Sequence, residues 1–270
     1  MPQLDVETAR RKAWEHANLC VRELRGELDE ETQKKLIVRL MDLFATHFLS
    51  PKAIGSVQEV SELAGVFEPP KTLEATDVAQ MLAEAKCILR GHFELLSGLH
   101  THYFFRFGNL ARSCDRIADD IVARLAGKAR PEAILVPTSA GAMLGSVLGR
   151  ELGASVVYAD VNERGRPVGI RPGSRAPHGT RVLIVNDMIT TGGGVKHLVD
   201  IALAQSWDIA GVAVFAVRGE HPDEILREAT TGIGYDVYAT AKLRLPAYPK
   251  DRCSLCQQKV PLYRSANLNR

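Results

Sequence analysis

The sequence contains no run of about 18 apolar residues, which is the length that a membrane-spanning helix needs. Residues 1–16 carry charges throughout and lack the apolar core of a secretory signal peptide. Only five cysteines occur, an odd number, and Cys20, Cys87 and Cys114 are scattered. This pattern is not typical of a secreted disulfide framework. Together these absences predict a cytoplasmic protein without a membrane span.

The sequence also lacks a large excess of positive or negative charge. The formal net charge is +2 over 270 residues, of which 24% are charged and 46% hydrophobic. So small a net charge does not favour binding to nucleic acid or to a membrane surface. The composition is ordinary for a globular protein, and a chain of this size buries roughly three quarters of its unfolded surface. We expect a stable core that needs no disulfide bond.

The first part of the chain shows a helical pattern. Apolar residues recur at helical spacing in 31–48, and residues 6–25 also indicate a helix. The segment "GVFEPPKTLEATD" at 65–77 contains a Pro-Pro pair, which punctuates the end of this part. We predict a helical N-terminal extension over residues 1–75.

From about residue 132 the pattern changes to short apolar runs that alternate with amphipathic helices. The runs are residues 133–136, 155–161, 182–185, 211–217 and 235–240. Continuous apolar strands separated by helices indicate a parallel sheet covered on both faces. We predict an α/β fold for the second domain, residues 76–270.

The segment "VLIVNDMITTGGG" at 182–194 carries the strongest functional signal. Asp187 follows an apolar strand, and ligands of parallel sheets bind beyond the carboxyl ends of the strands. The two threonines and three glycines that follow offer hydroxyl and backbone N–H donors at the start of a helix, which suit a phosphate monoester. An acid just upstream suits sugar hydroxyls. The alternative is a strand, a turn and a glycine-rich helix start without a ligand, although neither a Gly-x-x-x-x-Gly-Lys-Ser/Thr nor an initial Gly-x-Gly-x-x-Gly motif is present.

This segment resembles the phosphoribosyl-pyrophosphate signature of type I phosphoribosyltransferases. Three further segments resemble those of orotate phosphoribosyltransferases: "GHFELLSGLHTHYFF" at 91–105, "VPTSAGAMLG" at 136–145 and "VFAVRGE" at 214–220. The resemblance covers residues from about 77 to 265. It implies a Rossmann-like type I phosphoribosyltransferase core for the α/β domain.

By this resemblance, Asp187 holds the ribose hydroxyls. The implied site for phosphoribosyl pyrophosphate (PRPP) joins a pyrophosphate loop to the phosphate-binding loop and comprises Ser139, Ala140, Gly141, Asn186, Asp187, Thr190, Thr191, Gly192, Gly193 and Gly194. Phe104 and Phe105 would place the base, and Arg218 would pair with its polar edge. A serine on a tight turn and an aromatic pair in the core are the alternatives for Ser139 and for Phe104 and Phe105.

The resemblance also implies the reaction. Ribose 5-phosphate would pass from PRPP to orotate or a similar pyrimidine base, with release of pyrophosphate. The family uses Mg²⁺, which takes few protein ligands, so we expect no metal-binding cluster in the sequence. A homodimer is the expected assembly.

Two departures from the family pattern bear on catalysis. The family usually has two acids where this chain has Asn186 and Asp187, and the loop at 159–179 contains no lysine. Arg164 and Arg166 are candidates to supply the missing charge to phosphate oxygens, together with Arg171 and Arg175. Solvated arginines on a Gly/Pro-rich loop are the alternative.

We therefore assign Asp187, Arg164 and Arg166 as the candidate catalytic residues. Two other hypotheses stay open. The protein could bind PRPP or a nucleotide as a regulator without turnover, or residues 1–75 could recruit a protein partner.

Cys253 and Cys256 form one Cys-x-x-Cys pair, which supplies two of the four ligands of a structural zinc site. We favour a structural feature over a redox centre. His92, His100 and His102 lie close together in sequence, but their spacing indicates no metal geometry. We interpret them as substrate-loop or surface residues.

Overall fold

The computed structural model describes residues 5–22, 28–95, 97–138, 141–163 and 165–264. These residues form two compact units, each assembled from separate parts of the chain. The first unit comprises Met1–Ala53, Leu89–Phe104 and Ala247–Arg270, and the second comprises Ile54–Ile88 and Phe105–Pro246.

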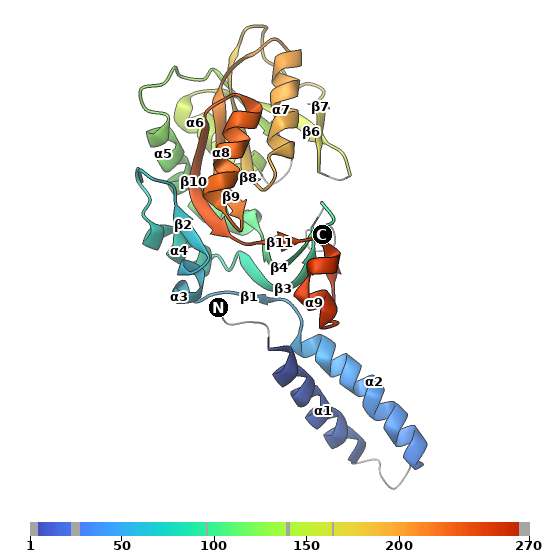
Figure 1. Cartoon of the computed structure of the whole chain (residues 1–270). Coiled ribbons are helices and arrows are strands. Elements are labelled where there is room, and N and C mark those ends of the chain that lie inside the picture. The colour runs from blue at the N-terminus through green and yellow to red at the C-terminus, as the bar shows by residue number, and fades with distance from the viewer. Residues whose placement is uncertain (1–4, 23–27, 96, 139–140, 164, 265–270) are drawn as a thin grey trace. The chain divides into compact units, whose positions relative to one another are not determined.

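The second unit is built around a seven-stranded sheet in the order β2-β10-β9-β8-β5-β6-β7 (Figure 1). Its strands are β2 (Ala64–Val66), β5 (Ala133–Pro137), β6 (Ser155–Val161), β7 (Pro167–Ile170), β8 (Arg181–Ile189), β9 (Asp208–Gly219) and β10 (Val237–Arg244). The five central strands pair in parallel, and β2 and β7 add antiparallel edges. The predicted α/β fold with a parallel sheet is confirmed.

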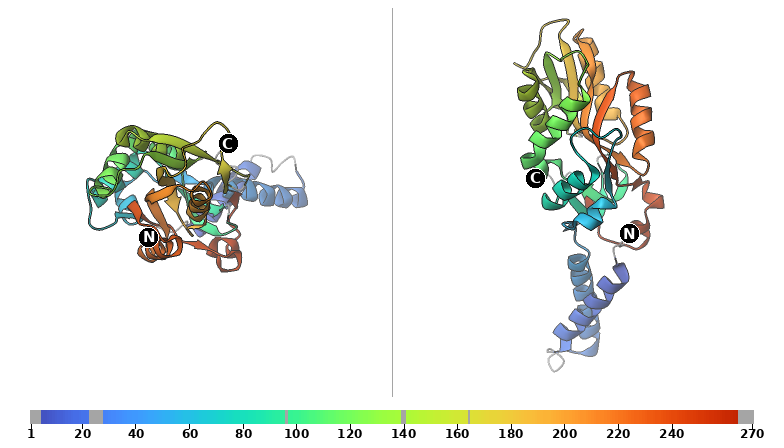
Figure 2. Two further views of the ribbon diagram at one scale, coloured as in Figure 1. Left: turned by 90° about the horizontal axis from the view of Figure 1, so that it is seen from above. Right: turned by 90° about the vertical axis from the view of Figure 1, so that its left-hand side faces the viewer.

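Helices cover both faces of this sheet (Figure 2). They are α3 (Val57–Ser61), α4 (Ala75–Glu84), α5 (Cys114–Arg124), α6 (Gly141–Leu152), α7 (Gly193–Ala204) and α8 (Pro222–Ile233), with a 3₁₀ helix, η1 (Phe107–Ser113). Leu135 joins the core cluster that contains Leu198 of α7. A methyl group added to Gly145 of α6 would lie 3.0 Å from the side chain of Val136. Neighbouring strand residues point to opposite faces, so α6 and α7 cover opposite sides of β5.

The first unit contains a smaller sheet and a pair of helices. Its sheet has the order β1-β3-β4-β11, and β12 pairs with β3. Its elements are α1 (Val6–Arg22), α2 (Glu30–Phe48), β1 (Lys52–Ala53), β3 (Ile88–Glu94), β4 (His100–Phe105), β11 (Ala247–Tyr248), the 3₁₀ helix η2 (Lys250–Arg252), α9 (Ser254–Gln257) and β12 (Tyr263–Arg264). The helix predicted at 31–48 is confirmed, as is the one predicted at 6–25 as far as residue 22; residues 23–25 lie outside the described residues. The units do not follow a boundary at residue 75, because residues 54–75 belong with the larger sheet, where β2 pairs with β10.

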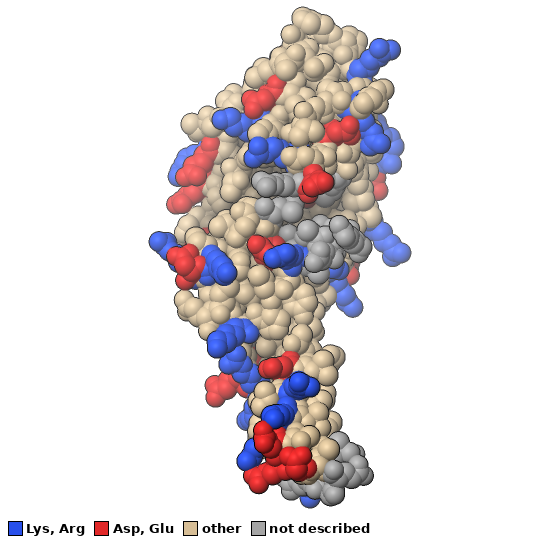
Figure 3. Space-filling view, turned by 90° about the vertical axis from the view of Figure 1, so that its right-hand side faces the viewer, with Lys and Arg blue, Asp and Glu red and all other residues tan. Residues whose placement is uncertain are grey.

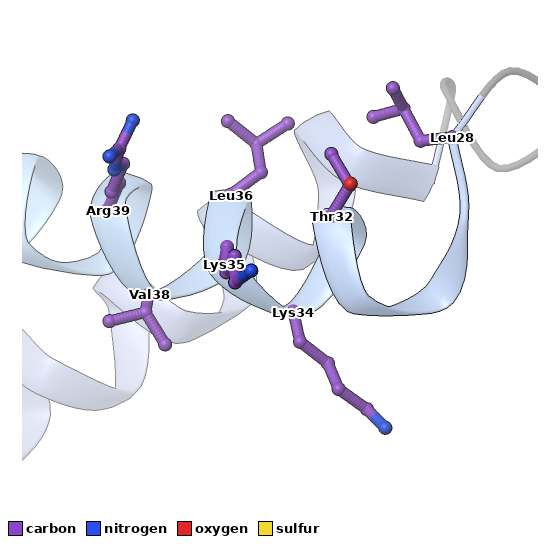
Figure 4. A pocket seen from close by; sticks show the side chains of 7 residues that line it. All are labelled: Leu28, Thr32, Lys34, Lys35, Leu36, Val38 and Arg39. Carbon is purple, nitrogen blue, oxygen red and sulfur yellow. The ribbon is translucent and has the colours of Figure 1, made fainter.

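Helices α1 and α2 differ in how much they bury. One face of α1 is buried, and α2 has no buried residue. The buried residues of α1 recur every three or four positions and are Val6, Ala9, Ala13, Ala17 and Val21. Val38 and Leu43 on α2 are 59% and 64% exposed. A surface pocket on α2 is lined by Leu28, Thr32, Lys34, Lys35, Leu36, Val38 and Arg39 (Figure 4), none of which belongs to the predicted site.

Charges of both signs are interspersed over the face of the molecule that Figure 3 shows. Two exposed pairs on α2, Lys34 with Glu30 and Lys35 with Glu31, follow the i, i+4 spacing of a solvated helix. Within the described ranges, no helix has the length and apolarity needed to cross a bilayer.

A buried carboxylate, Asp120 on α5, ties three parts of the larger unit together. It accepts hydrogen bonds from the Thr72 amide at 3.0 Å and the Thr240 hydroxyl at 2.7 Å, and it pairs with Arg124 Nε at 2.6 Å. Burial by itself would raise the pKa of Asp120, but the hydrogen bonds from Arg124, Thr72 and Thr240 outweigh it and lower the pKa below its usual value. The carboxylate is therefore held in its charged form.

We expect Asp120→Asn to lower the free energy of unfolding by about 3 kcal/mol, because it leaves Arg124 without its buried partner. Since the folded-state pKa of Asp120 is depressed, its contribution is present at neutral pH and lost as the pH falls below about 4. Urea denaturation at pH 7 and pH 3.5 measures both effects. Asp119→Asn, at the adjacent exposed position, is the control; an equal loss in both variants would contradict the assignment.

Candidate functional site

The PRPP-like segment leaves the sheet at the carboxyl end of β8. The strand continues to Ile189 rather than ending at Val185, because Asn186 and Met188 pair with residues of the longer strand β9. Asp187 therefore lies within the strand end and not after it, which corrects the sequence prediction. The exposed Thr190 and Thr191 follow the strand.

Helix α7 begins directly after this turn. Gly192 caps it in the left-handed conformation, with φ of 77°, and the helix starts at Gly193, slightly before the predicted start near Val195. A residue with a side chain is strained at such a φ, which explains one glycine of the run. Thr190 and Thr191 thus stand beside the free backbone N–H groups of a helix N-terminus, the arrangement that favours a bound anion.

Gly141, the first residue of α6, lies against the backbone of Asn186 and Asp187. A methyl group added to Gly141 would come within 3.1 Å of Asn186 Cα and 3.3 Å of the Asp187 backbone nitrogen. On the other side, a methyl group on Gly194 would lie 3.8 Å from Asn186 Nδ2. The structure therefore brings together the end of the implied pyrophosphate loop and the PRPP-like segment. Ser139 and Ala140 lie outside the described residues.

Asp187 is half-buried, and the loss of solvation raises the pKa of its carboxyl group from 3.8 to about 6, although the amides of Met188 and Asp187 itself act in the opposite direction. A desolvated carboxylate at the end of a parallel strand is costly unless a ligand or cation compensates it. Such a group is a candidate binding residue.

A groove of about 400 Å³ lies between the glycine-rich loop and α8. It is lined by Thr190, Thr191, Gly192, Gly193, Lys196, Ile225, Glu228, Ala229, Gly232 and Ile233. Lys196, in the first turn of α7, was missed by the sequence analysis. The sequence signal for Lys196 was its position two residues after the three glycines, because a lysine there adds positive charge beside the glycine-rich turn.

Arg218 lies at the carboxyl end of β9, the strand next to β8. Its side chain is 5% exposed, and Nε donates to the carbonyl oxygen of Leu245 at 3.2 Å. Burial lowers the pKa of Arg218 to about 10, so the guanidinium stays charged at neutral pH. Arg218 and Asp187 therefore lie at the same edge of the sheet, as neighbouring strands in parallel place them.

Phe104 and Phe105 are both buried, and they face different neighbours. Phe104 packs against Phe93, with ring centroids 5.5 Å apart, whereas Phe105 stacks on Phe215 at 6.1 Å. Both lie in β4, where adjacent side chains point to opposite faces. The two rings therefore make separate contacts that fit the core alternative, and the role of Phe104 and Phe105 in placing the base stays a prediction.

The lysine-free segment at 159–179 contains a β-hairpin and not only a loop. Strand β7 pairs antiparallel with β6, and the Asn162 side chain accepts a hydrogen bond from the Arg166 amide at the turn. Arg166 is exposed, and Arg164 lies outside the described residues. The catalytic role of these two arginines stays a prediction.

His92 and His100 are 1% and 2% exposed, so the interpretation of the histidines as surface residues is wrong for these two. The strands β3 and β4 turn their imidazoles inward, next to Cys253 and Cys256. His102 is half-buried and hydrogen-bonds Ser254.

Hydroxyl and backbone N–H donors, a lysine and a desolvated carboxylate thus lie at the described edge of the larger sheet, a set of groups that suits a phosphorylated sugar or nucleotide. No family model matches the chain. A curated orotate phosphoribosyltransferase from Thermus thermophilus is 28% identical over 188 residues, 69% of this chain and 98% of that protein. Another from Carboxydothermus hydrogenoformans is 27% identical over 191 residues, 69% of this chain and 94% of that protein.

A solved orotate phosphoribosyltransferase structure, from Aeropyrum pernix, aligns at 21% identity with a TM-score of 0.46, covering 59% of this chain and 90% of that chain. The curated sequence relatives confirm the resemblance to orotate phosphoribosyltransferases.

We expect Gly141→Ala to weaken PRPP binding by about tenfold, because the added methyl group displaces the backbone of Asn186 and Asp187 by a few tenths of an ångström. Isothermal titration with PRPP and Mg²⁺ measures the change. Gly108→Ala is the control, because nothing lies within 4 Å of a methyl group there. Unchanged affinity in the Gly141 variant would show that this contact does not shape the site.

We expect Asp187→Asn to stabilise the protein at pH 7.5 by about 1–2 kcal/mol, a value reduced for the partial solvent exposure of the side chain. The folded-state pKa of Asp187 is raised, so the stability that this group contributes is present below pH 4 and lost as the pH rises to about 6. Urea denaturation at pH 4 and pH 7.5 measures this: the two proteins should differ only at the higher pH. The exposed Asp200→Asn serves as control, and a destabilised Asp187 variant would refute the reasoning.

Proposed function

We propose that the protein is a phosphoribosyltransferase that transfers ribose 5-phosphate from PRPP to orotate or a similar pyrimidine base and releases pyrophosphate. The observation that carries the proposal is the contact of Gly141 with the backbone of Asn186 and Asp187. It joins the two segments that resemble the pyrophosphate and PRPP motifs at one edge of a parallel sheet. The relatives named orotate phosphoribosyltransferase support the choice of base.

Different side chains at this edge bind different parts of the substrate. The hydroxyls of Thr190 and Thr191 and the amides at the start of α7 hold the 5′-phosphate, and Lys196 adds positive charge beside it. The Asp187 carboxylate accepts hydrogen bonds from the ribose hydroxyls. Its raised pKa means that substrate binding weakens as the pH falls below about 6.

The reaction is a displacement at the anomeric carbon of the ribose. A ring nitrogen of the base attacks, the bond to pyrophosphate breaks, and the sugar passes through a state with oxocarbenium character. The protein contributes by holding both reactants in line and by keeping groups of fixed charge near the reacting atoms. Arg218 holds the polar edge of the base through its planar guanidinium, which is desolvated and already oriented by Leu245.

Mg²⁺ fits this site. Asp187 offers a desolvated carboxylate, and no neighbouring cation is among the causes of its pKa shift. Asn186 adds an amide oxygen beside it. Magnesium needs only one or two protein ligands when substrate phosphates and water complete its shell. When bound, the ion neutralises charge on the pyrophosphate oxygens.

The role of Arg164 and Arg166 in neutralising the pyrophosphate also belongs to the proposal. The Arg166 side chain is exposed at the turn between β6 and β7, where it is free of the core. A homodimer, a cytoplasmic location and a protein partner for residues 1–75 are proposed as well. The exposed apolar side chains of α2 support the partner.

One observation favours the second candidate function, binding of PRPP without turnover. Asn186 stands beside Asp187 in place of a second acid, and its side chain is confined between Gly141 and Gly194. A neutral amide there lowers the negative charge available to the sugar and metal.

An assay of the full-length protein with PRPP, Mg²⁺ and orotate separates the two functions, with pyrophosphate release and orotate absorbance as readouts. We expect turnover, a loss of about 10²–10³-fold in kcat/KM for Asp187→Asn, and wild-type kinetics for Asp200→Asn. Saturable PRPP binding without pyrophosphate release would support the regulatory function. Neither binding nor turnover would leave the glycine-rich segment as a turn without a ligand.

A further inference from the structure

Four potential metal ligands meet in the smaller unit, and none of them is a residue assigned to PRPP. They are His92 of β3, His100 of β4, Cys253 and Cys256, and their ligand atoms all lie within 4.8 Å of one another. His92 and Cys253 are separated by 161 residues in sequence. The Cys-x-x-Cys pair supplies two metal ligands, and the fold brings two histidines to it to give four.

The distances fit a tetrahedral ion. His92 Nε2 lies 3.1 Å from His100 Nδ1 and 3.5 Å from Cys253 Sγ, and His100 Nδ1 lies 3.1 Å from Cys256 Sγ. Ligand atoms held about 2.0–2.3 Å from a tetrahedral zinc ion lie about 3.3–3.8 Å apart. The four atoms therefore need only small shifts to surround one ion.

The hydrogen bonding of His92 orients the imidazole for this role. Its Nδ1 lies 2.9 Å from the carbonyl oxygen of Val260. A carbonyl oxygen only accepts, so Nδ1 carries the proton, and Nε2 of the neutral ring presents its lone pair to the cluster. A histidine that binds a metal typically has its second nitrogen fixed in this way.

Charge and burial select the kind of ion. His92, His100 and Cys253 are each at most 2% exposed. Two thiolates neutralise a divalent cation, so the complete group carries no net charge in the interior. Two sulfur and two imidazole ligands in a tetrahedron favour zinc. With four protein ligands there is no open position for substrate.

A redox function of the cysteine pair fits less well. Reactive cysteines lie in partially exposed, electropositive surroundings. The Cys253 side chain is fully buried, and it packs in a cluster with Val6, Leu255 and Val260.

We propose that His92, His100, Cys253 and Cys256 form a structural zinc site that fastens the C-terminal segment to the sheet of the smaller unit. Helix α9, which follows Cys253 and contains Cys256, has only four residues and is too short to be stable alone. The same segment holds the N-terminal helices, because Gln258 accepts a hydrogen bond from Arg10 at 2.6 Å and Leu255 packs with Val6 and Leu49. The ion therefore stabilises a junction of three chain segments: α1, the β3–β4 pair and the C-terminal residues.

The test starts from the full-length wild-type protein, purified without an affinity tag and dialysed against metal-free buffer. Elemental analysis should find about one zinc ion per chain, as expected for four protein ligands. After removal of zinc, added Co²⁺ should produce the visible bands of a tetrahedral ion and thiolate-to-metal charge transfer in the near ultraviolet. These readouts do not depend on phosphoribosyl transfer, so the proposal can fail or hold independently of the proposed function.

Paired variants locate the ligands. Cys256→Ser and His100→Asn should each lower zinc affinity by at least about tenfold. The exposed Cys20→Ser and the neighbouring His102→Asn should retain full zinc content and the cobalt spectrum. Circular dichroism verifies that each variant is folded.

Several outcomes would overturn the site. One is wild-type protein that contains no zinc and shows no tetrahedral cobalt spectrum, whatever the behaviour of the variants. Another is equal metal binding in Cys256→Ser and Cys20→Ser. Finding Cys253 and Cys256 joined in a disulfide in protein that binds neither metal would replace the zinc site with a redox pair.

Discussion

The close approach of α6 to the end of β8 is the constraint on which the candidate site depends. A methyl group at position 141 would lie only 3.1–3.3 Å from the backbone of Asn186 and Asp187, so a larger residue there would push this backbone away by a few tenths of an ångström. Because β5 and β8 are neighbours in the sheet, the two loops that follow them leave the same edge side by side. The arrangement of the groups that would hold PRPP follows from this one backbone contact.

Two charged groups at the same edge, Asp187 and Arg218, are shielded from water by burial. Burial raises the pKa of the Asp187 carboxyl group and lowers the pKa of the Arg218 guanidinium, and in both cases desolvation is the largest cause. Such groups cost folding free energy in the free protein. In the proposed function, the sugar hydroxyls of PRPP and Mg²⁺ would contact the Asp187 carboxylate and offset part of its cost.

Much of the larger sheet could be predicted from sequence, because a strand buried on both faces is a continuous apolar run between amphipathic helices. The glycine-rich turn after β8 was equally visible, since its chemistry is local. The length of β8 could not be predicted, because the polar Asn186 and Asp187 interrupt its apolar run and the strand continues to Ile189 through pairing with β9. Phe104 and Phe105 were assigned to one ligand although strand alternation separates them. The His and Cys cluster was hidden for another reason: its members come from distant segments, and spacing along the chain says nothing about such contacts.

The discontinuity of the two units has a consequence for the order of synthesis. The larger unit is complete once residue 246 has been made, whereas the smaller one begins with α1 and ends with β12. On the ribosome, β3 and β4 are therefore synthesised long before β11 and β12, the strands that pair with them. Folding in order of emergence leaves those two strand edges open until residues 247–264 have been made. Residues 247–264 thus complete a sheet that already includes β1, which was made at residues 52–53.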